Sequence, residues 1–218
     1  MGGSGVQADQ GDEHSMRTIV APYGRWEPAT PAQVASLLSA MPCPWWVAGG
    51  FAIELAVGHH IRDHGDIDVV MLRPDQHHLC DALRGWEYWA ADPPGVLRPW
   101  EPTETLPGPV HDIWCRPGPD EPWRIQVIFD EASNGQWISR RDPGIRCPVT
   151  EIGKVSPDGI PYLAPEIQLF YKARQPRPKD QIDFLAILPH LTTSQRRWLS
   201  EALAHSFGTH PWQERLAC

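Results

Sequence analysis

The fold is decided by residues 46–55, WVAGGFAIEL, together with residues 62–70, RDHGDIDVV. A glycine pair ends one apolar run, and two aspartates open the next. Side chains at positions i and i+2 of an extended strand leave the same face, so Asp66 and Asp68 would stand side by side while Ile67 turns into the core. Because Mg²⁺ takes one or two protein carboxylates together with phosphate oxygens and waters, this pair predicts metal-dependent phosphoryl chemistry.

The glycine pair, Gly49 and Gly50, indicates where a phosphate would lie. It stands between a strand-like run at residues 45–48 and a helix-like run at residues 51–57. Glycine has no Cβ, so the backbone can approach a phosphate closely, and the N-terminus of the following helix attracts an anion. A helix of about two turns fits between Gly50 and Asp66. Two neighbouring strands are therefore expected to share one nucleotide.

The order Gly-Gly, short helix, Arg-x-His-x-Asp-Ile-Asp resembles the nucleotidyltransferase superfamily of DNA polymerase beta. It is most similar to the antibiotic-modifying branch, the aminoglycoside 2″-adenylyltransferases and lincosamide nucleotidyltransferases. The resemblance is specific over about residues 45–74 and weaker over 124–131 and 166–188. It implies an α/β (α+β) fold, in which a mixed polymerase beta-like sheet with helices is followed by a C-terminal helical part.

The same resemblance implies an antibiotic-resistance activity. Asp66 and Asp68 would hold Mg²⁺ and act as catalytic residues. A nucleoside monophosphate, with AMP favoured, would pass from a nucleoside triphosphate, with ATP favoured, to a hydroxyl of a small molecule such as an aminoglycoside-like antibiotic. Two alternatives remain: a toxin–antitoxin type of nucleotidyltransferase that acts on protein or RNA, and a catalytically degenerate nucleotide-binding relative.

The nucleotide-binding residues follow from the residues around these motifs and from a second cluster downstream. Residues 165–173 have apolar positions at helical spacing, and Pro178 suits the first turn of another helix. In the resembled family a comparable lysine-bearing helix followed by a Lys-Asp pair lies beside the nucleotide. The alternative is a solvated helix in which Lys179 and Asp183 form an ion pair. The expected nucleotide-binding set is Gly49, Gly50, Arg62, His64, Lys172, Arg177 and Lys179.

The proton acceptor is where the chain departs from the resembled family. The family adds a third carboxylate from a later strand, and the matching position here is near Gln126, which cannot act as a general base. Asp130 shares a strand face with Gln126 but lies further along, since two residues advance about 6.6 Å. Asp112 on the preceding strand and a mechanism with two aspartates alone are alternatives. We favour Asp130 as the catalytic base.

Composition bounds the partners and the compartment. With 218 residues of which 41% are hydrophobic, the chain can bury a sizeable core, and it has no apolar run of the roughly 18 residues that span a membrane. Five scattered cysteines predict neither a zinc site nor a disulfide framework and fit the cytoplasm. A net charge of −8 argues against a nucleic-acid partner and favours a small cationic or neutral acceptor. The oligomeric state stays open.

The pattern divides the chain into three parts. Residues 1–16 read as a disordered tail, residues 17–158 as the nucleotidyltransferase domain, and residues 159–218 as a C-terminal helical part. The proline-rich stretch 91–109 is expected to form an irregular flap near the site. Thr30, Pro31 and Gln33 carry the signals of a helix start. Other helices are expected at residues 51–57, 75–83 and 194–205, and strands near Trp45, Asp66, Trp86, Ile113 and Ile125.

Overall fold

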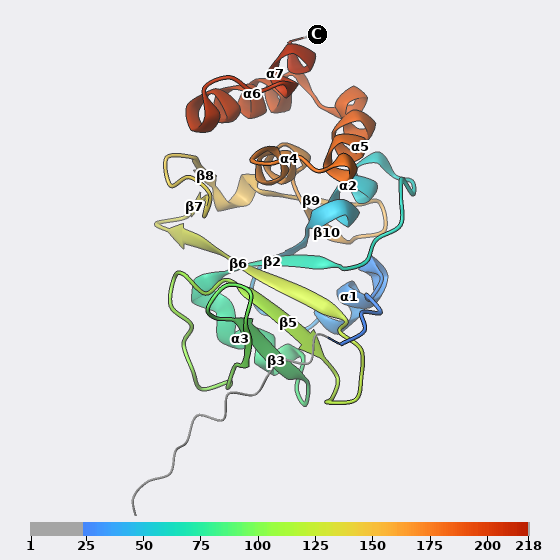
Figure 1. Cartoon of the computed structure of the whole chain (residues 1–218), viewed down its shortest axis with the longest axis vertical. Coiled ribbons are helices and arrows are strands. Elements are labelled where there is room, and N and C mark those ends of the chain that lie inside the picture. Colours follow the sequence, from blue (N-terminus) through green and yellow to red (C-terminus); the bar gives the residue numbers. More distant parts are fainter. Residues whose placement is uncertain (1–23, 218) are drawn as a thin grey trace, which may run out of the picture.

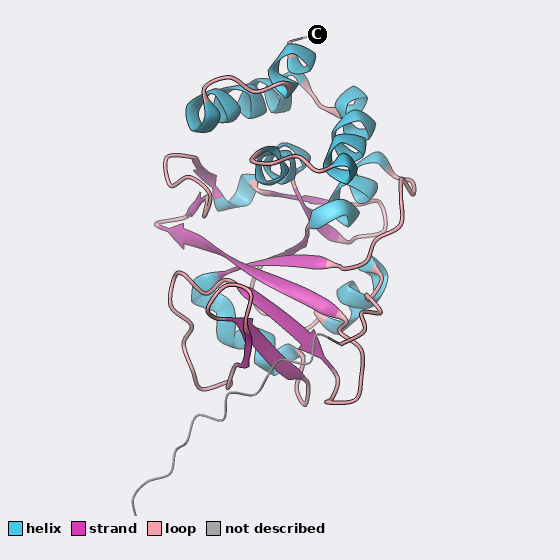
Figure 2. Ribbon diagram, viewed as in Figure 1, coloured by secondary structure: helices cyan, strands magenta, loops and turns pink. Residues whose placement is uncertain are grey.

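The computed structural model of the chain describes residues 24–217, so the predicted disordered tail lies outside the described residues. A twisted mixed sheet crosses the middle of the molecule with helices on both faces (Figures 1 and 2). The helices are α1 (Pro31–Leu37), α2 (Gly49–Val57), α3 (Gln76–Ala82), α4 (Pro165–Ala173), α5 (Pro178–Ile187), α6 (Thr193–Phe207) and α7 (Trp212–Leu216). Short 3₁₀ turns cover Arg73–Asp75, Val149–Glu151 and Leu188–His190. The predicted fold class is confirmed.

The strands are β1 (Trp45–Val47), β2 (Asp68–Leu72), β3 (Glu87–Ala91), β4 (Leu97–Pro99), β5 (Asp112–Arg116), β6 (Ile125–Ser133), β7 (Gln136–Ile138), β8 (Arg146–Pro148), β9 (Gly153–Val155) and β10 (Pro161–Leu163). They are ordered β4-β3-β5-β6-β2-β1-β10-β9, and β7 and β8 extend from the end of β6. The β2–β6 and β1–β10 pairs are parallel, and the remaining pairs are antiparallel. Strand β2 is therefore central to the sheet.

The alternation of side chains along β2 builds two cores. Val69 and Met71 face the core that the sheet shares with α1 and α3, whereas Val70 and Leu72 face the core that it shares with α4, α5 and α6. Because side chains alternate along a strand, Asp68 leaves the sheet on the same face as Val70. The second of the two predicted aspartates is thus placed beneath the C-terminal helices.

Helix α1 begins where the sequence predicts a cap. The Thr30 hydroxyl accepts from the Gln33 N–H at 3.2 Å, and the Gln33 side chain accepts from the Thr30 N–H at 2.9 Å. This reciprocal capping box satisfies two of the donors that a helix N-terminus leaves unpaired. Thr192 opens α6 with the same arrangement. Prolines occupy the first position of α4 and α5, as expected.

The structure departs from the expected organisation in three places. Asp66 lies in the loop before β2, which begins at Asp68. The region predicted to be helical after Gly159 first supplies β10, which pairs with β1 and belongs to the sheet. Residues 91–109 include β4 and do not lie over the site. They pack near α3, because Trp100 and Leu106 are buried and the Leu106 N–H donates to Gln76 at 2.7 Å.

Candidate active site

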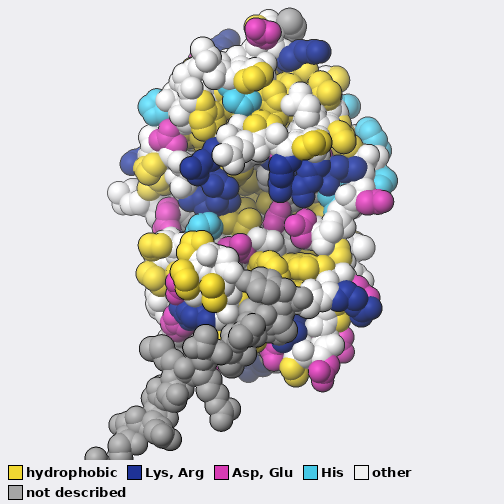
Figure 3. Space-filling model, in the orientation of Figure 1, with side chains coloured by type: hydrophobic (Ala, Val, Ile, Leu, Met, Phe, Trp, Pro, Cys, Tyr) yellow, Lys and Arg dark blue, Asp and Glu magenta, His cyan; other side chains and the backbone are white. Residues whose placement is uncertain are grey.

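A cavity of about 560 Å³ lies between the sheet and the helices α4 and α5. The start of β2, the glycine turn, the middle of β6, the start of β5 and the segment after β7 all contribute to it. Basic side chains outnumber carboxylates among its lining residues. Figure 3 shows a hollow with acidic side chains in it and two groups of basic side chains along its edge. The cavity is therefore suited to an anionic ligand bound together with a cation.

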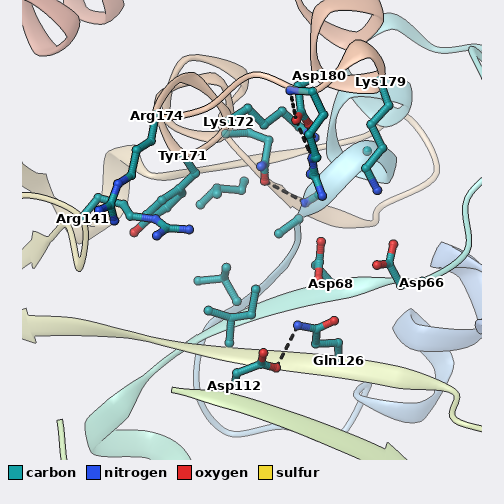
Figure 4. A pocket seen from close by; sticks show the side chains of 18 of the residues that line it. Asp66, Asp68, Asp112, Gln126, Arg141, Tyr171, Lys172, Arg174, Lys179 and Asp180 are labelled. Carbon is teal, nitrogen blue, oxygen red and sulfur yellow. Dashed lines mark hydrogen bonds and ion pairs between the residues drawn. The ribbon is translucent and has the colours of Figure 1, made fainter. Parts of the chain in front are cut away.

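Asp66 and Asp68 point into this cavity beneath α4 and α5 (Figure 4). Both are partly buried, and within residues 24–217 neither carboxylate has a hydrogen-bond or ion-pair partner. Burial and the neighbouring charge of Asp66 raise the pKa of Asp68 to about 7, against the opposing effect of Lys172. Two neighbouring carboxylates without a side-chain partner form a donor set that fits Mg²⁺, which completes its shell with phosphate oxygens and water.

The glycine pair is required by the packing of this site. Gly49 has a φ of +65°, and a Cβ built there would overlap the Asp68 carboxylate. A Cβ at Gly50 would overlap the Arg62 guanidinium and the His64 ring. The Gly49 N–H donates to Gln168 Oε1 at 2.7 Å, which fixes the turn. Both glycines line the cavity. Besides the close approach of a phosphate that the sequence predicts, the packing of neighbouring side chains requires glycine at both positions.

Arg62 and His64 serve the site differently. Arg62 lines the cavity and holds both oxygens of Asp183, at 2.8 and 2.9 Å. The His64 ring is not among the cavity-lining residues. It packs against Phe51 with ring centroids 4.1 Å apart, and its Nε2 lies 2.9 Å from Glu54 Oε1. We therefore assign His64 to the support of the turn rather than to direct contact with a nucleotide.

Lys172, Arg177 and Lys179 all line the cavity, as the sequence predicted. Lys172 Nζ lies 3.0 Å from Asp180 and 2.9 Å from Asp183, and Arg177 Nε donates to Asp180 at 2.8 Å. These cations hold the pKa of Asp180 below its usual range, against the opposing effect of burial. The alternative ion pair between Lys179 and Asp183 does not form, because Asp183 is taken by Arg62 and Lys172. Figure 4 shows Lys179 reaching toward Asp66.

Asp130 is not brought into the cavity. The register pairs it with Leu72 of β2, whereas Gln126 is paired with Asp68. Its side chain is fully buried and accepts from Trp137 Nε1 at 2.8 Å, from the Tyr171 hydroxyl at 2.7 Å and from Arg140 Nε at 3.2 Å. A carboxylate with this many partners, and without access to the cavity, is an anchor for β7 and α4.

Asp112 lines the cavity together with Asp66 and Asp68. It lies at the start of β5, and its Oδ1 accepts from Gln126 Nε2 at 2.8 Å (Figure 4). Burial raises the pKa of Asp112, while the Gln126 amide and Arg140 lower it. The position expected to carry the family carboxylate therefore holds an amide that orients a carboxylate of the next strand.

Several cavity residues were missed by the sequence analysis. They are His111, Arg140, Arg141, Gln168, Tyr171 and Arg174. His111 Nδ1 lies 3.0 Å from the Pro109 carbonyl, and burial together with Arg140 lowers its pKa. The adjacent arginines before Pro143 and Gly144 were a usable signal, since a basic pair at a turn is exposed to a ligand. No sequence signal places that turn opposite α4.

The segment with the glycine pair and both aspartates also matches a known family. The model of the aminoglycoside-2″-adenylyltransferase family matches residues 32–92. A search of the curated proteins finds no match. None of the helices among residues 24–217 is long and apolar enough to cross a membrane. In that same part of the chain no group of three or more His, Cys, Asp or Glu side chains forms a metal cluster.

Solved structures of antibiotic nucleotidyltransferases share the fold. The solution structure of the antibiotic-resistance factor ANT(2″)-Ia is 16% identical, with a TM-score of 0.54 over 81% of this chain and 90% of that chain. The crystal structure of ANT(2″)-Ia in complex with adenylyl-2″-tobramycin is 14% identical, with a TM-score of 0.50 over 80% and 95%. The lincomycin-bound lincosamide antibiotic adenylyltransferase LnuA is 16% identical, with a TM-score of 0.51 over 74% and 98%. The predicted resemblance to antibiotic nucleotidyltransferases is confirmed.

Proposed function

We propose that this chain is a Mg²⁺-dependent nucleotidyltransferase that transfers a nucleoside monophosphate, with AMP favoured, from a nucleoside triphosphate to a hydroxyl of a small molecule. One observation carries the proposal: two unpaired aspartates lie in a cavity that basic side chains surround. The similarity to structures with bound adenylyl-2″-tobramycin and lincomycin supports an antibiotic-like acceptor. The proposed reaction needs a supply of nucleotide, and free cysteines are typical of a reducing compartment. Both features fit the cytoplasm. The free cysteines are Cys43, Cys80, Cys115 and Cys147.

The metal site consists of Asp66 and Asp68. A Mg²⁺ ion bound there would polarise the phosphate and neutralise charge on the leaving pyrophosphate. Asp66 in the loop before β2 and Asp68 at the first position of β2 lie side by side above the sheet (Figure 4). Asp66 and Asp68 would supply the protein's oxygen ligands, and the triphosphate and water would supply the remainder.

The cations near the glycine turn bind the phosphates. Arg177 and Lys179 of the loop and first turn of α5 face the aspartates, and Lys172 is held between Asp180 and Asp183. A charge-assisted hydrogen bond to a phosphate exceeds a neutral one in strength, so these side chains orient the triphosphate and stabilise pyrophosphate as it leaves. Arg62 acts beside them and keeps Asp183 in place.

Asp112, rather than Asp130, takes the proton of the acceptor hydroxyl. Asp112 lines the cavity, whereas Asp130 is enclosed by Trp137, Tyr171 and Arg140. Burial raises the pKa of Asp112, which makes it a stronger base, and Gln126 fixes its orientation. The neutral amide at position 126 thus becomes a positioning residue for a base on the neighbouring strand.

The proposed function is tested by pyrophosphate release. The protein is incubated with each of the four nucleoside triphosphates, Mg²⁺, and separately with aminoglycosides, lincosamides, hydroxylated small anions, candidate proteins and RNA. We expect acceptor-dependent pyrophosphate release with a small molecule, and none with Asp68→Asn. Transfer only to RNA or protein would support the toxin–antitoxin alternative, and no release with any acceptor would contradict the proposed reaction.

A further inference from the structure

The basic side chains around the cavity form two groups that differ in their surroundings. The first, here called the α5 group, consists of Arg62, Lys172, Arg177 and Lys179 beside the glycine turn. The second, here called the arginine rim, consists of Arg140, Arg141 and Arg174, from the segment after β7 and the C-cap of α4. In Figure 4, Arg141 and Arg174 lie on the opposite side of Asp68 from Lys179.

The two groups differ most in how far their charge is neutralised. In the α5 group, Arg62, Lys172 and Arg177 are paired with Asp180 or Asp183, and Lys179 alone of the four has no such partner within the described residues. In the arginine rim, Arg140 pairs with Asp130 and lies 4.6 Å from the Tyr171 ring centroid. Neither the Arg141 nor the Arg174 guanidinium has a hydrogen-bond or ion-pair partner within the described part of the chain. The rim therefore holds uncompensated positive charge at the cavity.

The charges in the arginine rim lie close enough to repel one another. Burial, Arg140 and Arg174 all lower the pKa of Arg141. Three guanidinium groups from two elements converge here although the chain as a whole carries a net charge of −8. Guanidinium groups are planar donors that bind phosphate and carboxylate through paired hydrogen bonds. An anion between Arg141 and Arg174 would relieve their repulsion.

The geometry of nucleotidyl transfer places the acceptor beside one of these groups. In an in-line displacement the attacking and leaving oxygens lie on opposite sides of the phosphorus. With the phosphorus held at Asp66 and Asp68, pyrophosphate leaves toward one group of cations and the acceptor approaches from the other. The α5 group borders the glycine turn and the N-terminus of α2, where phosphates bind. The arginine rim consequently borders the acceptor.

We infer that the acceptor carries an anionic group, a phosphate or a carboxylate, that Arg141 and Arg174 bind. This inference rests on the proposed function and narrows its substrate class. It disfavours as acceptors the polycationic aminoglycosides that the sequence resemblance implied, because a polycation would be repelled by the positive charge of the arginine rim. Arg140 contributes less, since Asp130 already neutralises it.

Calorimetry with four sugar probes tests the inference. The protein is first loaded with Mg²⁺ and a non-hydrolysable nucleotide, and is then titrated with glucose 6-phosphate, glucuronate, methyl glucoside and tobramycin. The two anionic sugars distinguish phosphate from carboxylate, and methyl glucoside shows what the sugar ring binds without an anion. We expect at least one anionic sugar to bind tenfold or more tightly than methyl glucoside and than tobramycin.

Matched variants locate the binding. Arg141→Gln together with Arg174→Gln should weaken the anionic sugar at least tenfold and change nucleotide affinity less than threefold. Arg197→Gln, the same change at an exposed position of α6 outside the cavity, should leave both affinities unchanged. The inference is overturned if neither anionic sugar exceeds methyl glucoside, if tobramycin binds most tightly, if the double variant binds the sugar normally, or if it loses nucleotide affinity.

The loading step keeps the two proposals apart. Failure of Mg²⁺-dependent nucleotide binding would contradict the proposed function. The same probes are then titrated into nucleotide-free protein. The anion site is supported there if an anionic sugar binds more tightly than methyl glucoside and if the double variant loses this difference in affinity.

Discussion

Two carboxylate regions lie on one face of the same sheet, and they differ in how their charges are satisfied. Asp130, near the end of β6, is buried and accepts from an indole, a phenol and a guanidinium. The carboxylates of Asp66, in the loop before β2, and Asp68, at the first position of β2, have no hydrogen-bond or ion-pair partner within residues 24–217. The register places Asp130 beside Leu72, four residues beyond Asp68 and about 13 Å away along the strand.

The difference in hydrogen-bond partners distinguishes a carboxylate that stabilises the fold from carboxylates that are available to bind a ligand. Buried charges in proteins are normally paired, since an unpaired one costs free energy. A protein that leaves two partly buried carboxylates side by side and unpaired retains that cost unless a cation binds. The three donors to the Asp130 carboxylate therefore indicate a structural role for this residue. The lack of such donors to Asp66 and Asp68 supports the proposed role of these two residues in binding a metal. Asp112, which has the Gln126 amide and the Trp114 indole as partners, lies between these extremes.

The largest expected effect on turnover is at Asp112. Asp112→Asn should lower turnover by about 10² to 10⁴, the usual scale for loss of a general base, while nucleotide affinity stays near normal. Steady-state kinetics and calorimetry measure the two effects. Asp120→Asn, at an exposed turn, is the control. Normal turnover in Asp112→Asn would remove Asp112 as the proton acceptor.

The second effect is on stability and concerns Asp130. Asp130→Asn leaves the Arg140 guanidinium without its counter-charge and weakens the bonds from Trp137 and Tyr171. We expect a loss of about 2–3 kcal/mol in the free energy of unfolding, measured by urea denaturation. Turnover at a temperature where the variant is folded should stay within about threefold. A folded variant that has lost about a hundredfold in turnover would restore Asp130 as the base.

A smaller effect is expected at Gln126, whose amide donates to Asp112 at 2.8 Å. Gln126→Glu would place two carboxylates in contact, so one of them would keep a proton to a higher pH. Turnover should fall about tenfold at neutral pH, and the pH profile should move to higher pH. Gln126→Leu should lower turnover similarly and move the profile less, because it removes the amide that lowers the pKa of Asp112 but adds no second carboxylate. Higher activity in Gln126→Glu would mean that the natural chain lacks an effective base.

The smallest effect is a pH-dependent change in stability at Asp68, in metal-free protein. Burial and Asp66 raise the pKa of Asp68 to about 7, so the folded chain binds this proton more tightly than the unfolded chain. The stability that Asp68 contributes is present at low pH and is lost as the pH rises through about 7. Asp68→Asn should therefore exceed the natural chain by about 1–2 kcal/mol at pH 8, discounted for partial exposure, and by nothing near pH 4. Equal stabilities at both pH values would contradict this.

Local chemistry explains what the sequence could predict. The capping box at Thr30, the prolines that open α4 and α5, and the alternation of Asp68 with Val69 depend on residues near one another in the chain. The glycine pair and the two aspartates could likewise be placed in one site, because a short helix returns the chain to the neighbouring strand. These features are set by short-range geometry, and the sequence contains them directly.

The features that the sequence did not predict depend on strand register and on long-range packing. Asp130 has the correct parity, but only the pairing of β6 with β2 determines which residue of β6 lies beside Asp68. The arginine rim depends on how the turn after β7 meets the end of α4. Likewise, the stretch 91–109 is rich in proline, yet the burial of Trp100 and Leu106 draws it onto the opposite core.

The proposed joint binding of a metal–nucleotide complex by Asp66 and Asp68 is tested by calorimetry of nucleotide binding with and without Mg²⁺. Each aspartate is changed to Asn in turn, with Asp120→Asn as the surface control. We expect Mg²⁺ to strengthen triphosphate binding to the natural chain and to the control at least tenfold, and neither Asp66→Asn nor Asp68→Asn to show this gain while both remain folded. Equal Mg²⁺-dependent affinity in the natural chain and in both aspartate variants would contradict it.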